Sequence, residues 1–141
     1  QLTEIIRASI PMKYQKKSGH PAKRTFQAIR IELNRELDVL KNSLDDMIEI
    51  LNPGGRLCII TFHSLEDRIV KKFFEAAANP ASGINPRLPL LPSQLPQPLF
   101  NRAVRILPSE KECEENPRAR SSVLRGASRT DAPWPEQGVR V

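Results

Sequence analysis

The spacing of apolar residues predicts two amphipathic helices on either side of a buried strand. Residues 21–51 carry an apolar side chain at every third or fourth position from Phe26 to Leu51, which predicts one long helix, straight or kinked. Residues 57–62 (LCIITF) form an almost unbroken apolar run, typical of a parallel strand covered on both faces. Apolar residues at helical spacing return over 65–77. We therefore expect a central strand with both helices packed on its sheet.

A polar junction joins this strand to the second helix. Ser64 and Asp67 have the spacing of a capping box, with Ser64 as N-cap and Asp67 reaching back. His63 falls at the carboxyl end of the strand, where open α/β sheets bind ligands. Two roles stay open for His63: contact with a target base or cofactor, and fixing the turn from strand to helix. We interpret Ser64 and Asp67 as structural capping residues.

The remaining chain alternates short elements with loops. Residues 2–10 predict a short helix that ends before Pro11, and 13–20 predict a basic surface loop. Residues 79–101 are rich in proline and predict a long loop that is functional or disordered. Residues 104–107 and 122–127 are strand candidates, separated by a short helix that Ser109 would cap. We expect the tail, residues 131–141, to be disordered.

Positive charge gathers in two places and favours a polyanionic partner. The net charge is +6. His20, Lys23, Arg24 and Arg30 lie at the basic start of the long helix and are candidates for phosphate contacts. Asn34, beside the apolar stripe of that helix, could bind a base edge or only a helix neighbour. We interpret Phe26 as a core residue and not as a platform for base stacking.

A second basic cluster precedes the last strand. Asn116, Arg118 and Arg120 are candidates for RNA contact. The equally weighted alternative is a surface loop whose arginines pair with the acidic side chains at 112, 114 and 115.

The sequence shows no pattern for several other kinds of site. Cys58 and Cys113 lack metal-ligand spacing, so we expect no metal site and a reducing, cytoplasmic setting. No apolar run approaches the ~20 residues of a membrane span, so we expect no membrane partner. A Ser-His-Asp triad from His63, Ser64 and Asp67 is excluded by geometry, since neighbours at a helix start rarely place a base on an adjacent hydroxyl.

Three segments together resemble one protein family. HPAKRTFQAIRIELNRELDVL (20–40), GGRLCIITFHSLEDRIVKKFF (54–74) and ENPRARSSVLRGASR (115–129) resemble the C-terminal half of the bacterial 16S ribosomal RNA cytosine-N4 methyltransferases. The resemblance implies S-adenosylmethionine as cofactor and 16S ribosomal RNA of the small subunit as partner. It also implies an α/β fold: part of a Rossmann-like methyltransferase sheet, with the end of an inserted helical subdomain.

By this resemblance, residues 1–20 end the helical subdomain and 21–130 form the C-terminal half of the methyltransferase domain. The family's glycine-rich cofactor loop and catalytic loop have no counterpart here. Gly54 and Gly55 precede a strand and do not link a strand to a helix, so they predict no cofactor cradle. We therefore expect the chain to be the later part of a longer protein. We expect no cofactor-binding residue in it, name no catalytic residue because the family's catalytic loop lies upstream, and expect no activity from the chain alone. The alternative is a non-catalytic RNA- or ribosome-binding module of the same ancestry.

Overall fold

The structure is a computed structural model that describes residues 1–12, 20–85, 87–136 and 138–139. It divides into two compact units, residues 1–38 and 39–141. The predicted basic loop falls largely on 13–19, outside the described residues. Within the described part, no helix is long and apolar enough to cross a membrane.

Helices α1 and α3 belong to the first unit. Helix α1 (Leu2–Ser9) has the predicted extent and ends before Pro11. Helix α3 (Lys23–Asn34) begins two residues after Pro21 and ends at Arg35, whose φ of 51° and ψ of 36° are left-handed. The predicted long helix is therefore interrupted, because a left-handed residue breaks the helical hydrogen-bond pattern.

The apolar stripe of α3 is not a core in this chain. Phe26 is 47% exposed, Ile29 50% and Leu33 80%. Our interpretation of Phe26 as a core residue was wrong for this chain, because about half of its surface is exposed and it is not part of the core cluster.

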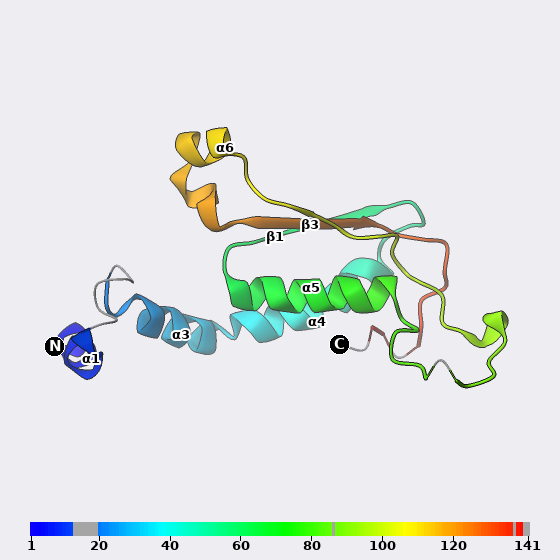
Figure 1. The fold of residues 1–141 in the computed structure, drawn as a ribbon, viewed down its shortest axis with the longest axis horizontal. Coiled ribbons are helices and arrows are strands. Elements are labelled where there is room, and N and C mark those ends of the chain that lie inside the picture. The colour runs from blue at the N-terminus through cyan, green and yellow to red at the C-terminus, as the bar shows by residue number, and fades with distance from the viewer. Residues whose placement is uncertain (13–19, 86, 137, 140–141) are drawn as a thin grey trace. The chain divides into compact units, whose positions relative to one another are not determined.

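The second unit is built around a helix lying on a small sheet (Figure 1). Helix α4 (Glu36–Glu49) starts within the first unit and supplies Leu44 and Ile48 to the core. Strand β1 (Arg56–Thr61) leads into helix α5 (Ser64–Ala78), which contacts the sheet. The core combines these with Phe100, whose ring stacks on Phe74 at a centroid distance of 5.2 Å.

The sheet differs from the predicted one. Its order is β1-β3-β2, with β2 (Val104–Ile106) and β3 (Val123–Ser128) confirming the two later strand candidates. Strand β1 pairs antiparallel with β3 and lies at an edge of the sheet. Its residues alternate between exposed and half-buried positions up to the buried Thr61. The prediction of a central parallel strand covered on both faces was wrong for this chain, because one of its faces and one of its edges have no covering element among the described residues.

The segments between these elements are short or irregular. Among its described residues, the proline-rich stretch contains the 3-10 turn η1 (Pro92–Gln94) and no other helix, and its end enters the core through Leu99 and Phe100. Helix α6 (Glu110–Glu115) is capped by Ser109 as predicted, and the 3-10 turn η2 (Pro117–Ser121) leads into β3. The described tail residues are not all detached, since Ala132 is 5% exposed and Trp134 packs against the core.

Candidate nucleic-acid interface

The strand register brings together two candidate segments that are distant in sequence. Thr61 at the end of β1 lies opposite Val123 at the start of β3. His63 follows the end of β1, and η2 with Arg118 and Arg120 precedes the start of β3. Both segments therefore belong to the same end of the sheet. Neither the apolar pattern nor the charge pattern had linked them.

His63 is the N-cap of α5. Its Nδ1 accepts a hydrogen bond from the backbone N–H of Glu66 at 3.4 Å, while Glu66 Oε2 accepts from the backbone N–H groups of His63 at 3.2 Å and Phe62 at 2.9 Å. The capping box therefore begins one residue before Ser64, and the predicted capping role of Ser64 was wrong. The reason is geometric: His63, with φ −142° and ψ 160°, has the extended backbone of an N-cap residue, and Ser64 is already helical.

This cap also fixes how the imidazole is held. Because Nδ1 is an acceptor, the ring proton of the neutral form belongs on Nε2, which lies 3.2 Å from Glu66 Oε1. The side chain of His63 is only 16% exposed. The structure thus shows the turn-fixing role for His63, while contact with a base stays a prediction.

Asp67 joins the helix to the sheet and does not cap it. Arg125 of β3 donates two hydrogen bonds to its carboxylate, from Nε at 2.8 Å and from Nη2 at 3.1 Å. Thr61 Oγ1 lies 3.5 Å from the same carboxylate. The Arg125 guanidinium holds the pKa of Asp67 below its usual value, and the charge of Arg105 adds to this effect, while partial burial opposes it.

Arg125 was missed in the sequence, although a signal was present. It is the one charged residue in the strand VLRGAS, and it is 9% exposed. A buried charge at such a position needs an opposite charge beside it, and the half-buried Asp67 is that partner.

The second basic cluster presents its arginines on a short turn. The Asn116 side chain caps η2 by accepting from the backbone N–H of Arg118 at 3.2 Å, and Ala119 anchors the turn with 5% exposure. Arg118 and Arg120 are exposed. Within the described residues, neither pairs with an acidic side chain of α6, where Glu115 instead lies 3.8 Å from Lys111. No ion pair among the described residues therefore supports the alternative of a salt-bridged loop.

The first unit holds the other basic candidates on α3 and just before it. His20, Lys23 and Arg24 are exposed. Arg30 donates to Glu36 at 2.8 and 3.1 Å, and Asn34 donates to the same carboxylate at 3.3 Å. Asn34 thus binds Glu36, as expected if its amide serves only a helix neighbour. Arg30 already has a carboxylate partner, so Lys23 and Arg24 are the better candidates for contact with an anion.

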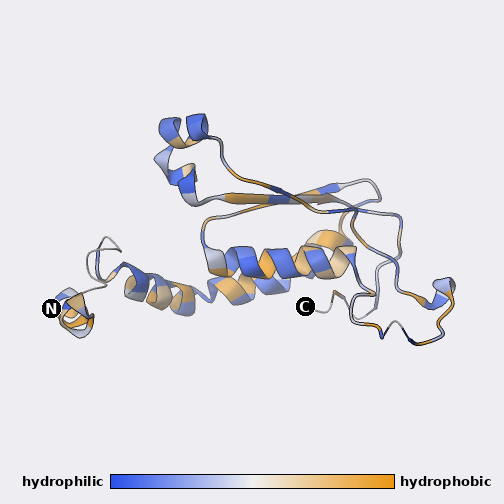
Figure 2. Cartoon of the chain, viewed as in Figure 1, coloured by the Kyte–Doolittle hydropathy of each residue, from blue (hydrophilic) through white to orange (hydrophobic). Residues whose placement is uncertain are grey.

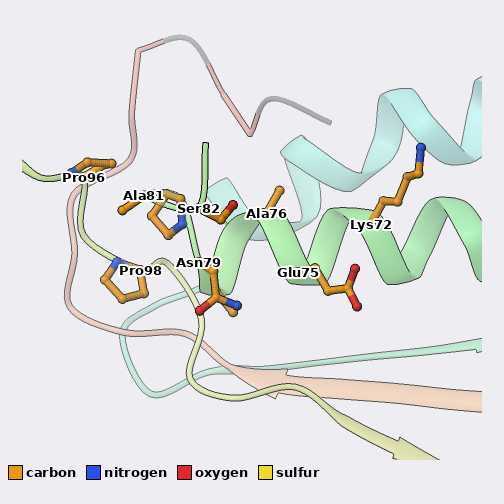
Figure 3. A pocket seen from close by; sticks show the side chains of 10 residues that line it. Lys72, Glu75, Ala76, Asn79, Ala81, Ser82, Pro96 and Pro98 are labelled. Carbon is orange, nitrogen blue, oxygen red and sulfur yellow. The ribbon is translucent and has the colours of Figure 1, made fainter. Parts of the chain in front are cut away.

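The second unit contains an open pocket. It has a volume of about 900 Å³ between the carboxyl end of α5 and the proline-rich stretch, lined by Lys72, Glu75, Asn79, Ser82 and Pro96 among others (Figure 3). Its polar groups do not converge on one point, so it indicates no particular ligand. In the described part of the chain, no three His, Cys, Asp or Glu side chains are grouped to hold a metal ion.

Together these features define a mixed α/β protein with exposed arginines at one end of an antiparallel sheet and a basic helix start in a separate unit. The chain belongs to the MraW methylase family, whose model matches residues 1–130. It is 55% identical over 133 residues to "Ribosomal RNA small subunit methyltransferase H 2" of Agathobacter rectalis, a match that covers 93% of this chain and 42% of that protein.

Two further relatives give the same picture. "Ribosomal RNA small subunit methyltransferase H" of Bordetella avium is 47% identical over 139 residues, covering 99% of this chain and 38% of that protein. The protein of the same name from Acetivibrio thermocellus is 50% identical, covering 89% of this chain and 40% of its own length. The chain thus spans about two fifths of the length of the relatives it matches.

Proposed function

We propose that this chain is part of an enzyme that methylates small-subunit ribosomal RNA. The reaction would transfer a methyl group from S-adenosylmethionine to the N4 amine of a cytosine in 16S ribosomal RNA. The observation that carries the proposal is the family match over residues 1–130, together with relatives named as ribosomal RNA small subunit methyltransferases.

Within that enzyme the chain would bind RNA and form one wall of the base pocket. The cytosine amine is a weak nucleophile because its lone pair is delocalised into the ring, so alignment of the base contributes much of the catalysis. The exposed Arg118 and Arg120 would hold phosphates beside the end of β1, and His63 would border the base. Lys23 and Arg24 of α3 would add phosphate contacts from the first unit.

The cofactor fits poorly on the residues of this chain. Gly54 and Gly55 form the turn before β1, and their N–H groups are already used: Gly54 donates to Arg129 O at 2.9 Å and Gly55 donates to Asn52 O at 2.8 Å. Such a turn offers no free backbone donors for a cofactor. We therefore assign S-adenosylmethionine to the part of the enzyme that this chain does not span.

The RNA role can be tested by the salt dependence of binding. Each phosphate contact releases counterions, so removing a contacting charge weakens the slope of log affinity against log salt by roughly 1. We expect the double variant Arg118→Gln/Arg120→Gln of the 141-residue chain to bind 16S ribosomal RNA less tightly, with a slope shallower by roughly 2. The pair Lys23→Gln/Arg24→Gln should act similarly.

The matched control removes two cations that pair with carboxylates elsewhere. Lys71 lies 3.5 Å from Glu75 and Lys111 lies 3.8 Å from Glu115. The variant Lys71→Gln/Lys111→Gln loses the same formal charge and should keep the wild-type slope. Equal slopes for all three double variants would show that net charge alone drives binding, and would remove these arginines from the proposed interface.

A further inference from the structure

The sheet of the second unit places two arginines side by side. Arg105 of β2 lies directly opposite Arg125 of β3, in the row that Ile59 of β1 completes. Side chains opposite each other on neighbouring strands share one face of the sheet, and like charges in that arrangement destabilise it. The two arginines therefore form a pair that folding alone does not favour.

One carboxylate serves both arginines. Arg125 donates to Asp67 of α5 from Nε at 2.8 Å and from Nη2 at 3.1 Å, so each carboxylate oxygen already accepts a hydrogen bond from that guanidinium. Arg125 is the main cause of the lowered pKa of Asp67, and the nearby charge of Arg105 adds to it. We call Arg105, Asp67 and Arg125 the charge group. It carries two positive charges against one negative charge.

The positive charge that lacks a partner is that of Arg105. Arg125 is buried, whereas all three residues of β2 are exposed. Helix α6, which follows β2 along the chain, is hydrophilic and has four glutamates (Figure 2). Among the described residues, however, no acidic side chain forms an ion pair with Arg105. Its guanidinium is therefore exposed without a direct countercharge in that part of the chain.

The register puts Arg105 close to the end of the sheet where the RNA interface is proposed. Strands β1 and β2 run in the same direction, because each is antiparallel to β3. Arg105 lies two rows from the last pair at that end, Thr61 and Val123, and two strand residues span roughly 7 Å. Asp67 belongs to the first turn of α5, which His63 caps. Arg105 and His63 thus both border that turn.

We propose that Arg105 binds a phosphate of the RNA backbone, next to the base that His63 would border. A guanidinium can hold a phosphate through two parallel hydrogen bonds, and a phosphate would supply the negative charge that the charge group lacks. Arg125 would stay on Asp67 and make no RNA contact, because its side chain is only 10% exposed. This inference rests on the proposed RNA role and adds a contact from β2.

The competing role for Arg105 is support of the ion pair between Asp67 and Arg125. The variant Arg105→Gln separates the two roles. Phosphate contact predicts weaker RNA binding with an unchanged urea midpoint, because an exposed charge contributes little to folding. A supporting role predicts a lower midpoint, as expected for Arg125→Gln, and unchanged RNA affinity of the folded chain.

The experiment measures the affinity of the 141-residue chain for 16S ribosomal RNA at several salt concentrations. We expect Arg105→Gln to bind at least about threefold less tightly at about 0.1 M salt, with a slope of log affinity against log salt shallower by roughly 1. The matched control is Arg56→Gln, which removes an exposed arginine opposite Ser128, at the other end of the same sheet. This control should keep the wild-type slope.

Two results would overturn the inference. One is a slope for Arg105→Gln equal to that for Arg56→Gln, and the other is a urea midpoint that falls as far as with Arg125→Gln. The variant Arg118→Gln/Arg120→Gln judges the proposed function separately. A shallower slope for that variant, with a wild-type slope for Arg105→Gln, would refute this inference only. The reverse result would remove η2 from the interface and support the contact of Arg105.

Discussion

The ion pair between Asp67 and Arg125 gives the sharpest prediction for the stability of the second unit. It joins the first turn of α5 to the central strand β3, and the Asp67 and Arg125 side chains are 23% and 10% exposed. Asp67→Asn keeps the size of the side chain but removes its charge and one of its two acceptor oxygens. Arg125 is then left nearly buried without a countercharge.

The magnitude follows from the two hydrogen bonds at 2.8 and 3.1 Å. A hydrogen bond to a charged group contributes roughly 1.5–3 kcal/mol, and breaking a fully buried pair costs roughly 3–5 kcal/mol. Asn retains one acceptor, and Asp67 is partly solvated. We therefore expect Asp67→Asn to lower the free energy of unfolding by about 2 kcal/mol at neutral pH.

The pH dependence has a definite sign. Because the pKa of Asp67 is lowered in the folded state, its contribution is fully present above the unfolded value of 3.8 and is lost as pH falls through the folded value. The difference between wild type and Asp67→Asn should therefore be constant near neutral pH and shrink below pH 3.8.

Urea unfolding of the 141-residue chain, followed by circular dichroism, measures these differences. A double-mutant cycle with Arg125→Met isolates the coupling between the two side chains. The control is Asp38→Asn, which removes an exposed pair with Arg35 at 3.3 Å and should cost less than about 1 kcal/mol. If Asp67→Asn costs no more than Asp38→Asn, or if its cost grows on acidification, the reasoning is wrong.

Three further predictions concern the cap, the core and the cofactor. His63→Ala should lower the free energy of unfolding by about 1 kcal/mol, because it removes the N-cap of α5. His63→Ser should restore the cap without the imidazole. A loss of RNA affinity in His63→Ser, measured by filter binding, would therefore report contact of the imidazole with a base and not the cap. Phe100→Ala, at a site with 1% exposure, should cost about 3–5 kcal/mol in urea unfolding, and a loss below about 1 kcal/mol would place Phe100 outside the core. Calorimetry should detect no S-adenosylmethionine binding by the chain alone, and saturable micromolar binding would show that the cofactor site lies here.

Much of the local structure could be predicted from the sequence. The apolar run at 57–62 predicted β1, and Ser109 predicted the start of α6. These predictions succeed because strand and cap preferences depend on neighbouring residues. The partner of β1 depends instead on a strand more than sixty residues later, which no local pattern specifies. The apolar run predicted two covered faces, but the described residues supply helices for one.

The candidate site was predictable as separate segments and not as an arrangement. Basic residues before the last strand and His63 after the first were visible in the sequence, but only the register of β1 with β3 places them at one end of the sheet. The break at Arg35 had no glycine or proline to signal it. The observed N-cap of α5 lies one residue before the predicted one. It was missed because serine is a more common N-cap than histidine, although Glu66 stood three residues after His63, where a capping box needs a glutamate.

The most direct test of the central claim is methyl transfer by a hybrid, defined as the Agathobacter rectalis relative in which this chain replaces the matched residues. Small ribosomal subunits that lack the modification are incubated with the hybrid and S-adenosylmethionine carrying a labelled methyl group, and the labelled nucleotide is identified by mass spectrometry. We predict incorporation at the N4 amine of one cytosine, at a rate within about tenfold of the unaltered relative, and none with the 141-residue chain alone. A cooperatively folded hybrid that transfers no methyl group, while the unaltered relative does, would contradict the claim that this chain is part of a ribosomal RNA methyltransferase.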